Sequence, residues 1–257
     1  MANEVTLNPI CDGWMEHSAH PGFLSWANLI IAAGTDADHT DTWAWAYFYT
    51  GNGAGANEWQ GLYRSVAIFD LTLYPNITIL SARLRVYGLY KGQLPLILPA
   101  TNVYGGTTVS PTALQASDYA TAQSVAFSDA ISYASWDDAG WNEWTLNEAG
   151  LTYLNDAVGD TVVLFIRNSN YDTAGIAPSW PGDNKSAGIA WAPTPAGAAT
   201  KPQLILTYID YSPRQTVAIE DKITLETIRN IEMVARGRFR VGKEGNATYR
   251  SRYARNV

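Results

Sequence analysis

Residues 62–90 read LYRSVAIFDLTLYPNITILSARLRVYGLY, and this stretch decides the fold class. In its second half, apolar side chains alternate with more polar ones. The apolar set is Leu80, Ala82, Leu84 and Val86, and the other set is Ser81, Arg83, Arg85 and Tyr87. A period of two predicts a β-strand with one buried face and one solvated face.

Similar short strands, separated by Gly, Pro, Asn and Asp, continue to about Ile209. The run TVVLFIR (161–167) is apolar on both faces, so we expect a central strand that is covered on both sides. Many strands with frequent turns predict an all-β domain built as an antiparallel β-sandwich.

One short helix is predicted in LNEAGLTYLNDAVG (146–159). Asn147 is placed to cap its N-terminus, and Gly159 is placed to end it. Between them, Leu151, Leu154 and Val158 form an apolar stripe at helical spacing.

Charge divides the chain into two predicted units. Residues 1–211 carry 7 Lys and Arg against 19 Asp and Glu, whereas residues 212–257 carry 10 against 5. We therefore predict a β-sandwich over 1–211 and a basic, extended C-terminal arm over 212–257. Within the arm, the segment 215–235 fits a helix and a strand equally well.

The arm ends in ARGRFRVGKEGNATYRSRYAR (235–255), where arginines recur at every second position. This alternation on both sides of a Lys-Glu-Gly-Asn turn predicts a hairpin with a guanidinium patch. Its arginines are Arg236, Arg238, Arg240, Arg250 and Arg252. Nucleic acid could bind such a patch, but no groove-reading or base-stacking motif accompanies it, so a neighbouring acidic subunit is the favoured partner.

Several classes of protein are disfavoured. The single cysteine, Cys11, excludes an intramolecular disulfide and a multi-cysteine metal site. No apolar run reaches the roughly 18–20 residues of a membrane helix, and no signal peptide is visible, so we expect synthesis in the cytoplasm and no membrane partner. No nucleophile elbow or phosphate loop occurs, and we expect a protein that is not an enzyme.

The stretch 63–88 resembles the core signature of DNRLRE-type domains, which are also classed with carbohydrate-binding module family 96. The matching elements are Arg64, Phe69-Asp70, Leu73-Tyr74-Pro75, Ile79, Ala82, Leu84 and Tyr87. The resemblance covers roughly residues 8–210. It implies a jelly-roll sandwich that binds polysaccharide or serves as a surface module, of a kind also found in phage virion proteins. The loop 34–61 and the segment SAGIAWAPTPAGAATKP (186–202) depart from the family's pattern.

Two candidate sites lie around the loop 34–61. Three carboxylates, Asp36, Asp38 and Asp41, form a candidate calcium site, with a solvated acidic loop as the alternative. Aromatic residues flank them, and their alternation in the strand places most of them on one face: Trp43, Trp45, Tyr47, Tyr49 and Trp59. Such a face suits stacking on sugar rings, a sandwich core or a subunit interface.

These observations favour a structural virion protein of a tailed phage: a capsid decoration, head-fibre or tail component. Its partners would be copies of itself, other virion proteins and host-surface glycans. The alternative is a carbohydrate-binding module on a bacterial surface or in the extracellular medium. A polysaccharide-degrading enzyme is the third reading.

Overall fold

The structure is a computed structural model that describes residues 2–51, 53–92, 97–179, 185–211, 238–241 and 247–250. The chain divides into two compact units, Met1–Ser212 and Pro213–Val257. Each is described by itself.

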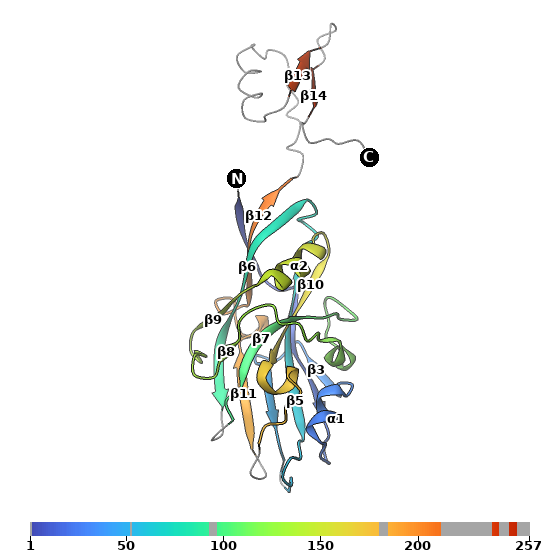
Figure 1. Ribbon diagram of the computed structural model, residues 1–257, viewed down its shortest axis with the longest axis vertical. Coiled ribbons are helices and arrows are strands. Elements are labelled where there is room, and N and C mark those ends of the chain that lie inside the picture. The colour runs from blue at the N-terminus through green and yellow to red at the C-terminus, as the bar shows by residue number, and fades with distance from the viewer. Residues whose placement is uncertain are drawn as a thin grey trace. The chain divides into compact units, whose positions relative to one another are not determined.

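The first unit is built mainly from β-strands, as predicted (Figure 1). Its strands are β1 (Asn3–Leu7), β2 (Cys11–Ser18), β3 (Asp36–Asp38), β4 (Ala44–Tyr49), β5 (Gly61–Asp70), β6 (Ile77–Gly92), β7 (Ala100–Gly105), β8 (Ile131–Ser132), β9 (Trp141–Thr145), β10 (Thr161–Asn168), β11 (Ser186–Trp191) and β12 (Gln203–Asp210). Its helical elements are α1 (Trp26–Ile31), α2 (Glu148–Asp156), η1 (Ala116–Thr121), η2 (Ser169–Thr173) and η3 (Thr194–Ala196).

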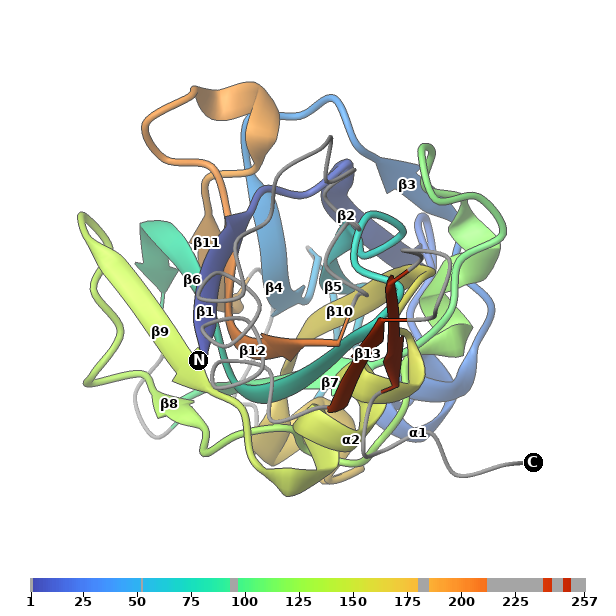
Figure 2. The ribbon, with the colours of Figure 1, turned by 90° about the horizontal axis from the view of Figure 1, so that it is seen from above.

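All of these strands pair antiparallel in one curled sheet. The order is β1-β12-β6-β11-β4-β5-β10-β7-β8, while β2 pairs with β5 and β3, and β9 pairs with β6. The 16-residue strand β6 joins all the strands into one sheet. One part of it pairs with β12 and β9, and its end pairs with β11. Figure 2 shows the strands curving around a common interior. The pairing thus forms an open curled sheet and does not establish the predicted two-sheet jelly-roll sandwich.

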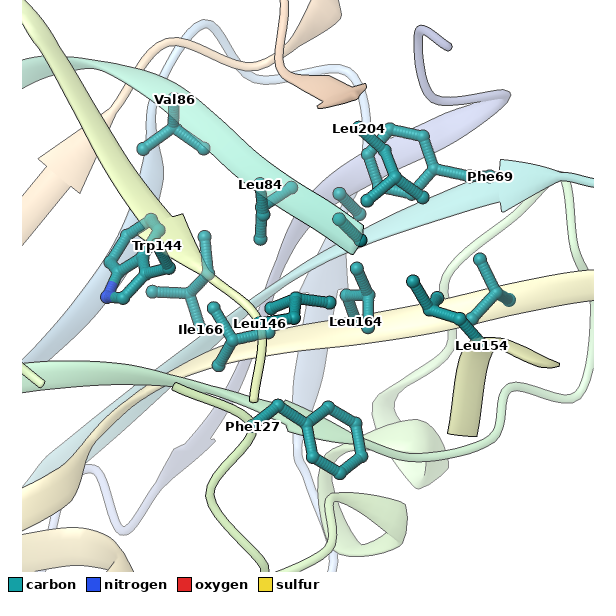
Figure 3. Close-up of a cluster of buried hydrophobic side chains, with 14 of the residues drawn as sticks. Phe69, Leu84, Val86, Phe127, Trp144, Leu146, Leu154, Leu164, Ile166 and Leu204 are labelled. Carbon is teal, nitrogen blue, oxygen red and sulfur yellow. The ribbon is translucent and has the colours of Figure 1, made fainter. Parts of the chain in front are cut away.

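The interior of the curl is filled with apolar side chains (Figure 3). Leu164 and Ile166 of β10, Leu84 of β6 and Leu204 of β12 meet there, and Trp144 of β9 packs beside them. Each of these side chains is almost fully buried. Burial at roughly 25 cal/mol per Å² of apolar surface makes this cluster the main stabilising element of the domain.

Strand β10 is covered on both faces, which confirms the prediction from TVVLFIR. Val162, Leu164 and Ile166 face the interior cluster. Val163 and Phe165 face a second cluster, which also contains Trp26 and Leu29 of α1 and Tyr119 of η1. The helical segments α1 and η1 therefore supply a cover for the other face of the sheet.

The alternation predicted for β6 holds from Ala82 to Val86 but is wrong at Leu80. Ala82, Leu84 and Val86 are buried, whereas the side chain of Leu80 is 46% exposed and Ile79 is buried. The register shifts at this point, because Ser81 lies opposite Thr207 and Ile79 lies opposite Tyr208. Leu80 is the extra residue of a β-bulge, which reverses the inward and outward positions beyond it.

Helix α2 confirms the predicted helix. The side chain of Asn147 accepts a hydrogen bond of 3.1 Å from the backbone N–H of Gly150, Leu154 is buried, and Gly159 has a φ of +85°. The expectation of a single helix is incomplete, because α1 also forms and is capped by Ser25. Its six residues are too few to display a helical period in the sequence.

A buried ion cluster joins the sheet to its cover. Asp172 of η2 accepts two hydrogen bonds from Arg64 of β5, at 2.6 and 2.9 Å, and two from Arg167 of β10, both at 2.9 Å. The remaining donors of Arg64 reach the carbonyls of Ile30 at 2.7 Å and Tyr119 at 2.8 Å. One carboxylate and two guanidinium groups thus fasten β5, β10, η2, the end of α1 and η1 together.

Charge keeps Asp172 ionised. Burial alone would raise its pKa, but the charges of Arg64 and Arg167 outweigh burial and lower the pKa to about 2. The stability that this group contributes is therefore present above the ordinary aspartate pKa of 3.8 and is lost as the pH falls toward 2.

We predict that Asp172→Asn destabilises the protein by about 3–5 kcal/mol at neutral pH, because two buried arginines lose their counter-charge. Urea unfolding measures the change. The exposed Asp129→Asn is the matched control and should change stability by less than about 0.5 kcal/mol. The gap in stability between D172N and the wild type should narrow as the pH falls toward 2, because protonation of Asp172 removes the same charge. Equal stabilities of wild type and D172N at neutral pH would contradict this account.

The described part of the second unit is an antiparallel strand pair, β13 (Arg238–Val241) and β14 (Ala247–Arg250). Arg238 lies opposite Arg250, and Arg240 lies opposite Thr248. This pairing agrees with the hairpin expected from the arginine alternation. Arg236, Arg252 and the segment 215–235 lie outside the described residues.

Candidate functional site

One face of β4 presents a continuous row of aromatic rings. Trp45, Tyr47 and Tyr49 are half-buried on this face, and Trp43 directly precedes the strand, whereas Ala44, Ala46 and Phe48 on the opposite face are buried. Neighbouring strands extend the row. We call the complete set the aromatic face: Trp14, Trp43, Trp45, Tyr47, Tyr49, Tyr63 and Tyr90.

The rings of the aromatic face pack against one another. Trp43 and Trp45 are stacked, with 5.2 Å between ring centroids and 15° between planes. The ring of Tyr47 lies 5.4 Å from that of Trp45 and 6.1 Å from that of Tyr63. Because each ring is held by its neighbours, little side-chain entropy remains to be lost when a ligand binds.

A depression of about 290 Å³ opens at one end of this face. Its walls are formed by Tyr47, Tyr49, Thr50, Tyr63, Lys185 and Ser186. It therefore combines aromatic surface with hydroxyl groups and one ammonium group. This mixture of flat apolar walls and a few polar groups is typical of small-ligand sites.

A buried carboxylate stands behind the depression. Glu16 of β2 is 7% exposed and lies opposite Tyr63 in the strand register. The hydroxyl of Tyr49 donates a hydrogen bond of 2.8 Å to Glu16 Oε1, and the Tyr63 hydroxyl also bonds to this carboxylate. Glu16 therefore holds two of the three tyrosines that line the depression.

Gly61 makes this contact possible. Tyr49 lies on β4 and Glu16 on β2, with β5 between them, so the tyrosine side chain has to pass over the first residue of β5. A Cβ atom at Gly61 would lie 2.1 Å from the ring of Tyr49 and 2.7 Å from Glu16 Oε1. Only glycine leaves room for the crossing, because these distances are far below van der Waals contact.

Burial shifts the protonation equilibria of this cluster. It raises the pKa of Glu16 above the ordinary glutamate value, although the hydrogen bonds from Tyr49 and Tyr63 lower it in part. Burial also raises the pKa of Tyr49 to about 12 and raises that of Tyr63. Both tyrosines consequently keep their hydroxyl protons at neutral pH.

Trp59, which the sequence grouped with these aromatics, is not on the aromatic face. It is fully buried in the second cluster, with its ring 4.9 Å from that of Trp26 and 5.6 Å from that of Phe48. Its side chain is a core element with no surface to offer to a ligand.

The three predicted calcium ligands accept hydrogen bonds from neighbouring residues of their loop and, in one case, from Trp14 of β2. Asp38 Oδ1 accepts hydrogen bonds from Thr40 and from the backbone of Asp41, and Asp41 Oδ2 accepts one of 3.1 Å from Trp14 Nε1. Asp36 accepts from the adjacent backbone N–H of Ala37. Within the residues that the structure describes, no group of three or more His, Cys, Asp or Glu is arranged to hold a metal ion. The calcium site and the solvated acidic loop both remain predictions.

Glu16, Gly61, Tyr63 and Lys185 were missed as site residues. The local sequence around Glu16 and Gly61 does not mark a binding site, because a lone glutamate has no signature and glycine is common in turns and loops. The contact between Glu16 and Tyr49 spans 33 positions and three strands, so it depends on the strand register. The predicted arm arginines cannot be related to this site, since their side chains are outside the described structure.

No protein-family model matches the chain, and no match is found among curated proteins. Function has to be inferred from the residues themselves. Among the helices in the described ranges, none is sufficiently long and apolar to span a bilayer.

Proposed function

We propose that the first unit binds carbohydrate through the aromatic face and the depression beside it. The observation that carries this proposal is the row of half-buried rings on β4 leading to the Tyr47–Tyr49–Tyr63 depression. Aromatic surface packs on the C–H faces of sugar rings, and hydroxyl and ammonium groups at the wall bond to sugar hydroxyls. The resemblance of residues 63–88 to polysaccharide-binding jelly-roll domains supports the same assignment.

We further propose that the protein is a structural component of a tailed-phage virion, and not an enzyme. The unlike charges of the two units support assembly, because an acidic surface and a basic arm on a second copy attract each other. In this proposal the curled sheet is a jelly-roll module that faces outward toward host glycans, and the arm docks on neighbouring subunits or other virion proteins.

A carbohydrate-binding module on a bacterial surface is the second candidate. The aromatic face favours it equally, since glycan binding does not require assembly. The arm distinguishes the two candidates: it has an essential role only in the first.

The glycan proposal predicts that Trp45→Ala and Tyr47→Ala each weaken polysaccharide binding about tenfold or more, because each removes a ring of the aromatic face. Affinity electrophoresis with a soluble glucan, mannan, galactan and xylan measures the change. Tyr208→Ala is the matched control, since Tyr208 is a half-buried aromatic residue on β12 that packs on Tyr74 and is not part of the aromatic face. Equal binding by W45A, Y47A and Y208A would contradict the proposed site.

The assembly proposal predicts that deletion of residues 212–257 abolishes self-association. Analytical ultracentrifugation of the full chain and of the 1–211 fragment, at matched concentrations and low salt, provides the comparison. Self-association of the full chain should also weaken as salt screens the opposite charges. If the fragment assembles as well as the full chain, the arm has no docking role.

A further inference from the structure

The hydrogen bonds behind the depression determine what it can recognise. A phenol carries a single hydroxyl proton, and an ionised carboxylate accepts hydrogen bonds without donating any. Tyr49 gives its proton to Glu16 at 2.8 Å, and Tyr63 is bonded to the same carboxylate. The oxygens of both tyrosines are then left with lone pairs only, so toward a ligand they act as acceptors.

We propose that Glu16 is a specificity-determining residue: by holding the hydroxyl protons of Tyr49 and Tyr63, it makes that wall of the depression accept hydrogen bonds. This inference rests on the proposed carbohydrate function and narrows it. The wall selects a glycan edge whose free hydroxyl groups donate, and it rejects one whose hydroxyls are blocked. Lys185 supplies donors at the other wall.

Three neighbouring residues fix the positions of the Tyr47 and Tyr49 side chains: Ser18, Ser186 and Gly61. Ser18 lies 3.4 Å from the Tyr49 hydroxyl and is the donor of that pair, because the tyrosine proton is committed to Glu16. The Tyr47 hydroxyl is hydrogen-bonded to Ser186. The missing side chain of Gly61 leaves the space in which Tyr49 reaches the carboxylate. Because the Tyr49 hydroxyl is held in this position, a change at Glu16 alters the hydrogen bonds that this wall of the depression offers to a ligand.

The charged surroundings of Glu16 come from several elements. Besides Tyr49 of β4 and Tyr63 of β5, Asp36 of β3 disfavours its ionised form and His17 of β2 favours it. No ion pair reaches Glu16 from any side chain in the described ranges. Protonation of Glu16 would therefore leave the tyrosine hydroxyls without their charged acceptor.

The test compares Glu16→Gln with the wild type for the polysaccharide of the four-member panel that binds best. A glutamine amide donates to one of the tyrosine oxygens and turns that hydroxyl toward the ligand as a donor. We expect an affinity loss of about tenfold. The wild-type affinity should fall as the pH is lowered from neutral, because protonation of Glu16 removes the charged acceptor of both tyrosines, and E16Q should change less because it has no carboxylate at this position. A partly O-methylated sample of the same polysaccharide should bind the wild type more weakly.

Glu143→Gln is the matched control: Glu143 lies on β9 in an ion pair with Arg83, and its loss should leave affinity and pH profile unchanged. If E16Q does not fold, Tyr49→Phe removes the same hydrogen bond from its other end and should also weaken binding and flatten the profile. Unchanged affinity and an unchanged pH profile in both E16Q and Y49F would overturn the role of Glu16.

A wild type that binds none of the four polysaccharides would overturn the proposed carbohydrate function. The Raman doublet of tyrosine tests the hydrogen bonds to Glu16 without any glycan. Its intensity ratio reports whether a phenol donates or accepts a hydrogen bond in the free protein. Loss of a donor-type tyrosine signal in E16Q supports the hydrogen-bond assignment, and an identical doublet in wild type and E16Q contradicts it.

Discussion

Asp172 meets two arginines in the interior of the domain, where they join the sheet to the helical segments that cover its second apolar face. The helical segments α1 and η1 are short, six residues each, so they cannot be stable by themselves. Arg64 reaches a carbonyl at the end of α1 and another in η1, and Arg167 reaches the carbonyl of Gln123 at 2.7 Å. Both arginines share the carboxylate of Asp172. The ion cluster thus adds polar ties to the apolar packing of α1 and η1 against β5 and β10.

The ion cluster also helps to fix the candidate site, because Arg64 and Tyr63 are consecutive residues of β5. Side chains alternate along a strand, so the arginine points to the ion cluster while the tyrosine points to the opposite face. There Tyr63 contacts the rings of Tyr47 and Tyr49 and bonds to Glu16. The depression is thus held from two directions: by the ion cluster behind β5, and by the buried carboxylate on β2.

Local patterns predicted the all-β class, the two-sided burial of β10, α2 with its Asn147 cap, and the shared face of Trp45, Tyr47 and Tyr49. Each depends on residues close together in the sequence. The bulge at Leu80, the curl of the sheet and the Glu16–Tyr49 contact depend on which strands become neighbours, and no local period encodes that.

The central claim is that the ion cluster makes the cover and the sheet one cooperative unit. Native-state hydrogen exchange with mass spectrometry tests it directly on segments 26–31, 116–121 and 169–173. If the cover and the sheet are one cooperative unit, the backbone amides of these segments exchange only through the global opening that also exposes β5 and β10. Their protection factors are then similar to those of the two strands. Exchange of the three segments orders of magnitude faster than β5 and β10 would show that the cover opens independently, and would contradict it.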